Sequence, residues 1–387
     1  MMHSWKKAFV ILLMGQLTWA AGPNTVSCLT PREADKTSSM KQRLKTFTAN
    51  FWEVMDREGA NYPAELKKTG FVVGDMHFAN MGLYYDYQLK GPNKFRIGLN
   101  DLDDAGTNLL IGDILKFLLY LDHLETKKKK ADLGSEHLDF PEILAQYAMG
   151  LTGVQPTDPP EEIKEIMGSE SEAKQALEKY LKKRKADTEE FAMSSLTAKQ
   201  ASMMAQLEDL DVLTKGVKIL GRSFKINDTG SSAGSERYLF YLQNNSNGTE
   251  GALEFKQLKC SATGPQDKQD LKTNFESIQA YIRSLSPDAA EPETITTWQQ
   301  VRFIDSSFFL LRLKNPNLLE DLKIEKMSWK KTQDYAEFYA QHLGYFHSKS
   351  SDETYRKAVT TESEFILKQL QKLAKAFNKS VKEDEKK

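Results

Sequence analysis

Hydrophobic residues recur with the spacing of an amphipathic helix in several parts of this chain. The segments with this spacing are 40–58, 332–348 and 360–377. Residues 109–124 are apolar on nearly every face, which is typical of a helix that is buried on all sides. Residues 161–200 are highly charged and helix-favouring, and they follow a proline-rich linker. The pattern therefore predicts helices on both sides of the middle of the chain.

Strand-like patterns occupy shorter segments. Residues 237–243 and 252–258 predict two strands, and the Asn- and Gly-rich stretch between them predicts a hairpin turn. Residues 301–313 predict another strand or strand pair. Two brief apolar runs nearer the N-terminus, 71–73 and 95–99, also have the length of buried strands. Because helical and strand segments are combined in this way, the predicted fold class is α+β.

Length, charge and composition narrow the class of protein. The 387 residues are enough for two domains or for one large domain with two lobes. Lys and Arg number 53 and Asp and Glu 54, so the net charge is −1 and no basic excess indicates a nucleic-acid partner. The two cysteines, Cys28 and Cys260, could pair in an oxidising compartment or remain two small apolar residues.

The first residues follow a pattern of their own. Lys6 and Lys7 precede an apolar run that ends near Ala20 and is followed by small residues. This pattern predicts a cleaved signal peptide over residues 1–21, and hence a periplasmic or secreted protein; the alternative is a buried N-terminal helix. No later segment is long and apolar enough to cross a membrane, so no membrane span is expected in the mature chain.

Each of the two short apolar runs near the N-terminus leads into an acidic motif. The motifs are Gly74-Asp75-Met76-His77-Phe78-Ala79-Asn80 and Asn100-Asp101-Leu102-Asp103-Asp104. An Asp and an Asn five residues apart, followed by a second Asp after the next strand, is an arrangement that phosphoryl transfer requires. Asp75 would orient or deprotonate an attacking hydroxyl. Asn80 and Asp101, with Asp103 as a further ligand or a neighbour of the ligands, would hold Mg²⁺ or Mn²⁺ through hard oxygen atoms.

Each of these residues also has a structural interpretation. Asp75 could cap a turn after a strand, and Asn80 could join its acidic neighbours in a polar network that holds the loop. His77 is a second candidate catalytic residue, although a lone histidine is more often expected to brace a loop by hydrogen bonds. Asp104 is expected to be exposed. Asp113 is expected to hydrogen-bond the loop backbone from the helix beneath it.

The two motifs resemble the catalytic core of the aminoglycoside-phosphotransferase branch of the protein-kinase-like superfamily. The resemblance continues at Gly112-Asp113-Ile114-Leu115, near the start of the buried helix. Residues 229–238 resemble a phosphate-covering glycine loop, and the resemblance implies that the residues approaching the phosphates are Gly230, Ser231 and Gly234. An ordinary flexible turn is the alternative interpretation of this segment.

A lysine–glutamate pair is the other part of the resemblance. Lys256 resembles the strand lysine that contacts nucleotide phosphates, and Glu276 resembles the helix glutamate that pairs with it. The alternative for Lys256 is an exposed strand lysine. In ordinary kinases these elements come first, whereas here the catalytic segment precedes them. The permuted order resembles an uncharacterised bacterial family, the domain-of-unknown-function 2252 family, over roughly residues 40–350.

The resemblance implies a two-lobed, protein-kinase-like α+β fold with the catalytic segment ahead of the glycine-loop segment. Its expected parts are a signal peptide (1–21), a helical lobe with the catalytic and metal motifs (22–215), a β-rich nucleotide lobe (216–300), a strand and C-terminal helices that complete the helical lobe (301–378), and a charged tail (379–387).

The implied activity is transfer of a phosphoryl or nucleotidyl group from ATP or another nucleotide, held with Mg²⁺ or Mn²⁺, to a hydroxyl acceptor. Two alternatives stay open. An exported, catalytically silent kinase-like binding protein is one, because ATP is scarce outside the cytoplasm. A metal-dependent phosphoesterase is the other, suggested by Gly-Asp-x-His, although it would need further histidines at the metal.

Overall fold

The computed structural model of the protein describes residues 25–26, 48–85, 94–99, 102, 104–130, 136–189, 192–214, 216–226, 234–246, 248–258, 261–263, 269–270, 278, 299–304, 307–314, 316–319 and 322–384. Several predicted features lie outside these residues: the signal peptide, Cys28, Cys260, Asp101, Asp103, Gly230, Ser231 and Glu276.

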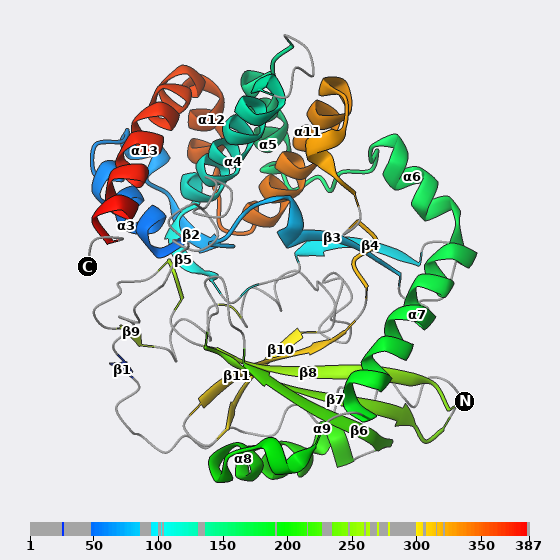
Figure 1. Cartoon of the computed structure of the whole chain (residues 1–387). Helices are drawn as coiled ribbons and strands as arrows, with labels where there is room; N and C mark the ends of the chain where they lie inside the picture. Colours follow the sequence, from blue (N-terminus) through cyan, green and yellow to red (C-terminus); the bar gives the residue numbers. More distant parts are fainter. Residues whose placement is uncertain are drawn as a thin grey trace.

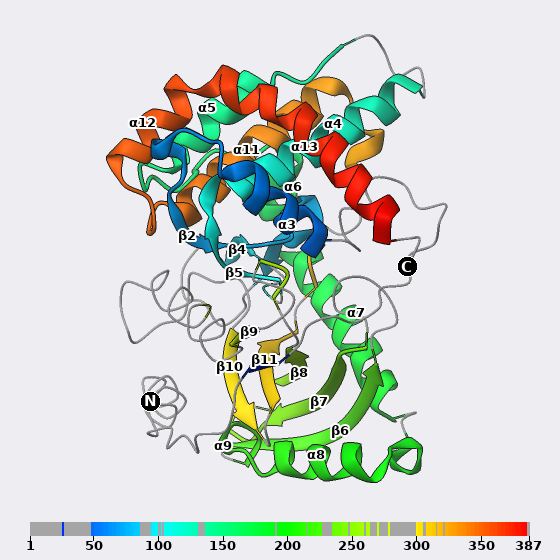
Figure 2. The ribbon, with the colours of Figure 1, turned by 90° about the vertical axis from the view of Figure 1, so that its left-hand side faces the viewer.

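A group of helices lies together and forms a helix-rich region (Figures 1 and 2). These helices are α3 (Thr48–Gly59), α4 (Leu110–Lys130), α5 (Phe140–Gly150), α11 (Trp329–His347), α12 (Glu353–Thr361) and α13 (Ser363–Asp384). Helix α4 is buried from its first residue to Leu121, as its uniformly apolar sequence predicts. The predicted helical segments 109–124 and 332–348 are thus confirmed as α4 and α11, and 360–377 falls largely within α13.

Helices α5 and α11 approach each other closely at two glycines. A Cβ atom at Gly344 would lie 2.1 Å from the carbonyl oxygen of Tyr147, and one at Gly150 would lie 2.0 Å from that of Gln341. Because neither glycine has a side chain, the two backbones can come together at these points. This contact fixes α11 against the remainder of the helix-rich region.

Two small antiparallel sheets lie beside these helices. Strand β2 (Thr69–Val72) pairs with β5 (Gly106–Leu109), and β3 (Met81–Tyr85) pairs with β4 (Phe95–Leu99). The two short strands predicted from apolar runs therefore exist as β2 and β4, but each pairs with a strand that the pattern did not predict. The first acidic motif follows β2 directly, and the second separates β4 from β5.

A five-stranded antiparallel sheet forms the other main part of the molecule, in the order β10-β11-β8-β7-β6. Its strands are β6 (Val217–Ile226), β7 (Glu236–Asn244), β8 (Glu250–Leu258), β10 (Gln299–Ile304) and β11 (Ser307–Leu313). The predicted hairpin is confirmed as β7 and β8, and the predicted strand pair as β10 and β11. Strands β10 and β11 extend this sheet, whereas the helices that follow them join the helix-rich region.

The two faces of this sheet differ in character. One face is apolar and packs against α8 (Ala198–Glu208) and α9 (Asp211–Thr214), through residues such as Phe240, Phe255 and Met204. The opposite face carries charged side chains and is crossed by α7 (Glu170–Glu189), which follows α6 (Glu161–Gly168). Alternation along each strand produces this division, because successive side chains point to opposite faces.

The remaining described elements are short. They are β1 (Thr25–Val26), which pairs with β9 (Gln269–Asp270), and four 3₁₀ turns at Ala64–Leu66, Phe78–Asn80, Met193–Ser195 and Ile324–Lys326. Within the described part of the chain, none of the helices has the length and apolar character that a membrane span requires. Helices and strands are combined throughout, so the fold is α+β.

Candidate functional site

The loop that follows β2 is anchored to the helix beneath it. Asp113, in the first turn of α4, accepts hydrogen bonds from the backbone N–H groups of Val73 (2.6 Å) and Gly74 (3.0 Å). The carboxylate is fully buried, and these bonds satisfy both of its oxygens. The contact predicted for Asp113 is therefore confirmed.

A chain of buried polar groups continues behind Asp113. His347 Nε2 lies 3.1 Å from Asp113 Oδ2, and His347 Nδ1 lies 2.7 Å from the hydroxyl of Tyr147. The Tyr147 hydroxyl is in turn 3.1 Å from that of Tyr355. Burial, and then the neighbouring Tyr355 hydroxyl, raise the pKa of Tyr147 well above its usual value, so Tyr147 stays protonated. This network joins α4, α5, α11 and α12 under the loop.

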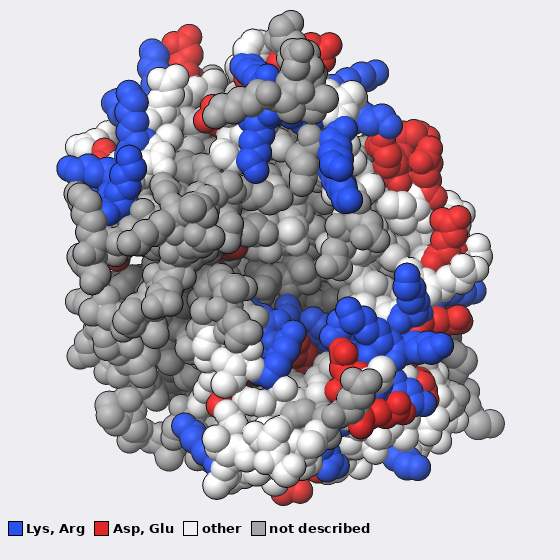
Figure 3. All heavy atoms as spheres, in the orientation of Figure 1, with Lys and Arg blue, Asp and Glu red and all other residues white. Residues whose placement is uncertain are grey.

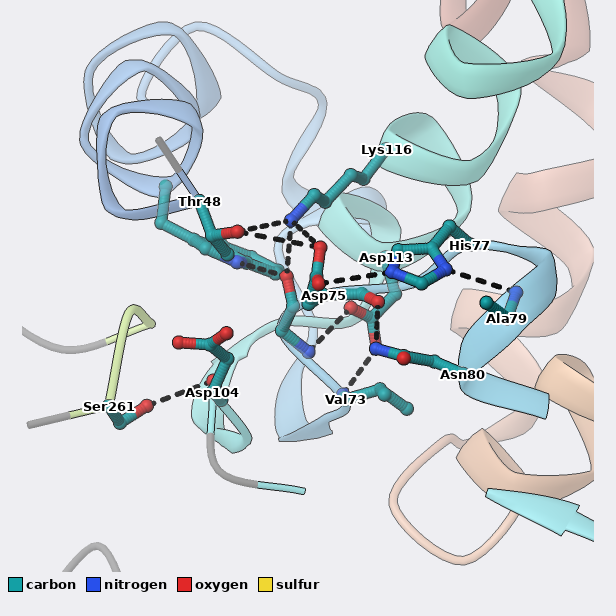
Figure 4. A network of polar contacts seen from close by, with 12 residues as sticks. Thr48, Val73, Asp75, His77, Ala79, Asn80, Asp104, Asp113, Lys116 and Ser261 are labelled. Carbon is teal, nitrogen blue, oxygen red and sulfur yellow. Dashed lines mark hydrogen bonds and ion pairs between the residues drawn. The ribbon is translucent and has the colours of Figure 1, made fainter. Parts of the chain in front are cut away.

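Asp75 projects its carboxylate into the centre of the site (Figure 4). Its Oδ1 lies 2.7 Å from Lys116 Nζ, and its Oδ2 lies 3.2 Å from His77 Nε2. The Asp75 side chain is 12% exposed and the Lys116 side chain 1%. The pair is therefore nearly buried, and the Asp75 side chain keeps a small exposed fraction.

Lys116 is held by three acceptors. Its ammonium group donates to Asp75 Oδ1, to Thr48 Oγ1 at 3.0 Å and to the carbonyl oxygen of Gly74 at 3.1 Å. An ammonium group has three N–H donors, so this buried cation is fully hydrogen-bonded. Trp52 Nε1 donates to the same Gly74 oxygen at 2.8 Å. Helix α3 thus supplies Thr48 and Trp52 to the site.

These contacts determine the charge of Asp75. Burial opposes the ionised form, but the charge of Lys116 and the hydrogen bonds from His77 and Lys116 outweigh it and hold the pKa of Asp75 well below its ordinary range. The carboxylate is therefore ionised at any physiological pH. A carboxylate of this kind is a weak proton acceptor and a strong hydrogen-bond acceptor.

His77 and Asn80 brace the loop from its far end. His77 Nδ1 accepts a hydrogen bond from the backbone N–H of Ala79 at 3.1 Å, so Nε2 carries the proton and donates to Asp75. Asn80 Nδ2 donates to the carbonyl oxygen of Asp75 at 2.6 Å. The Asn80 atom that could ligate a cation is therefore its Oδ1.

The second acidic segment lies against the first. Gly74 has a φ of +83°, and a Cβ atom there would lie 2.0 Å from the carbonyl oxygen of Asp104. Asp104 is buried, so the expectation that it would be exposed is wrong; the backbone contact with Gly74 draws it into the site. Asp101 and Asp103 lie outside the described residues, and their neighbours Leu102 and Asp104 are both buried.

The chain that leaves the large sheet also reaches this site. Ser261, three residues after the end of β8, donates its hydroxyl to the Asp104 carbonyl oxygen at 3.0 Å. Asn108 Nδ2 donates to the carbonyl oxygen of Thr263 at 2.8 Å. These bonds connect the strand that bears Lys256 to the segment that bears the second acidic motif.

The predicted nucleotide-binding residues are described only in part. Lys256 is completely buried on β8, between Arg237 of β7 and Leu310 of β11, so the exposed alternative is wrong. Gly234 precedes β7 with a φ of +72°, a conformation that favours glycine. Gly230, Ser231 and Glu276 lie outside the described residues, and the Lys256–Glu276 pair stays a prediction.

A metal site is not complete in the part of the chain that the structure describes. Those residues contain no group of three or more His, Cys, Asp or Glu that could hold a metal ion. The predicted set combines Asn80 with Asp101 and Asp103, two of which are not described. The oxygen chemistry of this set suits Mg²⁺ or Mn²⁺.

Several residues of this site were given no role from the sequence, above all Lys116, Thr48 and His347. One signal was available for Lys116. It is the single lysine of the segment 109–124, which is apolar on nearly every face, and a lysine buried in this way requires a partner of opposite charge. Thr48 and His347 carry no comparable signal, because distant segments bring them to the loop.

Comparison with known proteins supports part of the resemblance. Residues 206–386 match the model of a family described as "Uncharacterized protein conserved in bacteria" (DUF2252). The matched region begins in α8 and covers the large sheet and the C-terminal helices, including Lys256 and His347. No curated protein and no solved structure matches the chain.

Proposed function

We propose that this protein is a phosphotransferase with a permuted, two-lobed, kinase-like architecture. It would transfer a phosphoryl group, or a nucleotidyl group, from a metal-bound nucleotide to a hydroxyl acceptor. The observation that supports this most directly is the Asp75 carboxylate, which is ionised, anchored through both oxygens and adjacent to a second acidic segment. A phosphoryl-transfer site depends on such positioning more than on covalent chemistry.

In this proposal Asp75 acts chiefly by orientation. Its low pKa makes it a weak base, so it would align the acceptor hydroxyl and accept the proton late, once the hydroxyl has begun to bond to phosphorus. Lys116 and His77 would keep the carboxylate in place by their bonds to its two oxygens. His77 would thus serve as a positioning residue.

The metal and the nucleotide phosphates would lie together, between the acidic loop and the sheet that bears Lys256. Asn80 Oδ1, Asp101 and Asp103 would hold Mg²⁺ or Mn²⁺, which neutralises phosphate charge when bound. Lys256 with Glu276, and the loop containing Gly230, Ser231 and Gly234, would contact the phosphates of ATP or another nucleotide. The bond from Ser261 to Asp104 supports this arrangement, because it ties β8 to the acidic segment.

One specific observation favours a second candidate, an exported but catalytically silent kinase-like binding protein. Lys116, Thr48 and His77 already surround the carboxylate of Asp75, as they would in a purely structural ion pair. The predicted signal peptide would also take the protein away from cytoplasmic ATP. The phosphoesterase alternative has less support, because both ring nitrogens of His77 are engaged in hydrogen bonds.

The substitution Asp75→Asn tests the proposal. It removes the charge that orients the hydroxyl, so turnover of Mg²⁺–ATP should fall by roughly two to four orders of magnitude, the range for losing a general base. Nucleotide affinity, measured by thermal shift with ATP and Mg²⁺ or Mn²⁺, should change little, because other residues are assigned to the metal. The exposed carboxylate of Asp352 gives a control, and Asp352→Asn should leave both measurements unchanged.

Loss of the buried charge pair could by itself weaken the fold, so a double variant is needed. Asp75→Asn combined with Lys116→Met removes both charges and restores electrical balance. If the double variant recovers turnover, Asp75 is structural and the proposal is wrong. Absence of nucleotide-dependent turnover in the unaltered protein, with nucleotide binding retained, would instead identify the silent binding protein.

A further inference from the structure

The charged face of the large sheet gathers positive side chains from four elements. We call them the basic cluster: Arg184 of α7, Lys225 of β6, Arg237 of β7, Arg312 of β11 and Lys314 just after β11. Figure 3 shows Lys and Arg side chains gathered across the middle of this side of the molecule, over the sheet and α7. The strand register explains the gathering, since these strand positions share one face.

A single carboxylate, Glu254 of β8, lies at the centre of this cluster. Its Oε1 is 2.6 Å from Arg312 Nε and 3.7 Å from Lys314 Nζ, and its Oε2 is 3.8 Å from Arg237 Nη1. Burial opposes its ionisation, but Arg312 and then Lys314 hold the pKa of Glu254 well below its usual range. Only the contact with Arg312 has hydrogen-bond length, so Glu254 attracts Arg237 and Lys314 by charge without a hydrogen bond to either.

The other carboxylate near the cluster is engaged elsewhere. Asp187 accepts a hydrogen bond from Arg184 Nη1 at 2.8 Å, one turn along α7. No described carboxylate lies within 4 Å of Lys225 Nζ. The described part of the cluster therefore holds more positive than negative charge on a partly buried surface, which is costly unless an anion compensates it.

Two observations indicate that the cluster has capacity for a further partner. The Nε atoms of Arg184 and Arg237 are buried, and neither has a hydrogen-bond partner among the described residues. Burial and the neighbouring Arg312 lower the pKa of Lys314 to about 7, as expected where cations crowd together. Buried N–H donors without an acceptor are rare in folded proteins, and an anion would satisfy them.

We propose that the basic cluster binds a phosphate group. Arginine side chains present paired N–H donors that match the oxygens of phosphate, and a dianion supplies the missing negative charge. Donors come from three separate elements, α7, β7 and the end of β11, so different oxygens of one phosphate could each accept from a different element. The site is distinct from the Asp75 loop, because along β8 Glu254 lies on the far side of Lys256 from Ser261.

The phosphate could be free inorganic phosphate or part of a larger phosphate ester, and both present the same oxygens. This inference does not rest on the proposed phosphotransferase activity, because no residue of the basic cluster takes part in that proposal. Arg237 lies opposite Lys256 in the strand register, so the basic cluster borders the proposed nucleotide site; phosphate binding without nucleotide-dependent turnover would separate the two proposals.

The test is isothermal titration of the full chain with inorganic phosphate at pH 7, with chloride used to keep the ionic strength constant. Arg237→Gln removes a charged donor, and it should weaken phosphate binding about tenfold or more, the usual effect of losing one charge-assisted hydrogen bond. Arg222→Gln is the matched control. Arg222 lies on β6 and contacts Glu208 of α8, on the opposite face of the sheet, so its loss should leave phosphate binding unchanged.

A second variant and a second ligand complete the experiment. Lys314→Gln should also weaken phosphate binding, whereas Asp75→Asn should not. Comparing inorganic phosphate with adenosine 5′-monophosphate and adenosine separates the sources. If the monophosphate binds more tightly than inorganic phosphate and adenosine, and Arg237→Gln abolishes this difference, the natural ligand is a phosphate ester. If inorganic phosphate and the monophosphate bind equally, the ligand is the free anion. The proposal is overturned if phosphate binds no better than chloride, or if Arg222→Gln and Arg237→Gln weaken it equally.

Discussion

The ion pair between Asp75 and Lys116 is nearly buried in the candidate site. The carboxylate comes from a loop after β2 and the ammonium from α4, and each charge keeps the other from being an isolated ion in the interior. Removing one partner should therefore destabilise the fold more than removing a lysine from the protein surface would. This is a testable property of Lys116.

Lys116→Met should lower the free energy of unfolding at pH 7 by about 3–5 kcal/mol, the usual result of breaking a buried pair. The loss should shrink as the pH falls toward 4. Without Lys116, burial favours the protonated form of Asp75, so at lower pH the variant no longer holds an unpaired buried charge. In the unaltered protein the pKa of Asp75 is low, so the ionised carboxylate stabilises the fold until the pH falls below about 4. Urea denaturation at a series of pH values measures both effects.

Lys68→Met is the control for this experiment. Lys68 forms an ion pair with Asp352 at 2.8 Å, but both side chains are largely exposed, so its removal should have little effect. If Lys116→Met lost the same free energy of unfolding at pH 4 as at pH 7, the effect would not come from the charge of Asp75.

A buried histidine should govern stability in a higher pH range. Burial lowers the pKa of His342 to about 3, so His342 stays neutral in the folded protein. In the unfolded chain its pKa is about 6.5, and the unfolded state therefore binds more protons between these values. Stability should fall as the pH drops below 6.5, with His342 contributing up to about 1.4 kcal/mol per pH unit.

His342→Phe should flatten this dependence. The new ring can pack against Phe338, whose ring centre lies 4.6 Å from that of His342, and it cannot bind a proton. Denaturation midpoints between pH 7 and pH 4 should therefore change less in this variant. His137, which is largely exposed, provides the comparison, and His137→Gln should keep the slope of the unaltered protein.

At the scale of elements, the two acidic segments meet because Gly74 has no side chain. The carbonyl oxygen of Asp104 occupies the position that a Cβ atom would take. The φ of +83° adds a second reason for glycine, since other residues are strained in this conformation. The relative placement of the two segments thus depends on one residue.

Gly74→Ala should destabilise the protein by at least about 1–3 kcal/mol from backbone strain, with the contact against Asp104 adding to it. Because the segments must move apart, any effect of Mg²⁺ and nucleotide on the melting temperature should also diminish. Gly168, the last residue of α6, has open space around it, so Gly168→Ala should be neutral or slightly stabilising. Similar melting curves for the two variants would show that the close approach at Gly74 is not required.

Across the whole molecule, the hydrophobic core does not stop at the boundary of the helix-rich region. Leu258, Phe308 and Leu310 of the large sheet belong to the same buried cluster as Tyr339 of α11. The apolar residues beneath α8 and α9 form a separate cluster on the far face of the sheet. One shared core should make the two parts unfold together.

Met204→Ala tests this cooperativity. Met204 is completely buried in the cluster under α8, and truncation should cost about 2–5 kcal/mol. Trp52 and Trp329 lie in the helix-rich region, so the fluorescence of a protein that keeps only these two of its five tryptophans reports on that part. If the molecule unfolds as one unit, fluorescence and circular dichroism should shift to the same lower urea midpoint. A fluorescence midpoint that did not move would show two independent units.

Much of the local structure follows from sequence pattern alone. The uniformly apolar α4, the β7–β8 hairpin and the brief strand before Asp75 all have short-range signals, because periodicity and turn residues act over a few positions. The contact of Asp113 with the loop was likewise predictable from its place at the start of α4. The chemistry of the acidic motifs was visible for the same reason, since Asp75 and Asn80 are close in the sequence.

Only the tertiary structure decided which distant residues complete the site. Lys116 and His347 reach the loop from α4 and α11, Ser261 reaches it from the end of β8, and Asp104 is buried by its contact with Gly74. The same holds for the basic cluster, whose members become neighbours through strand order and register. The physical reason is common to all of them: charge, burial and pKa depend on neighbours in space, and sequence periodicity specifies neighbours only along the chain.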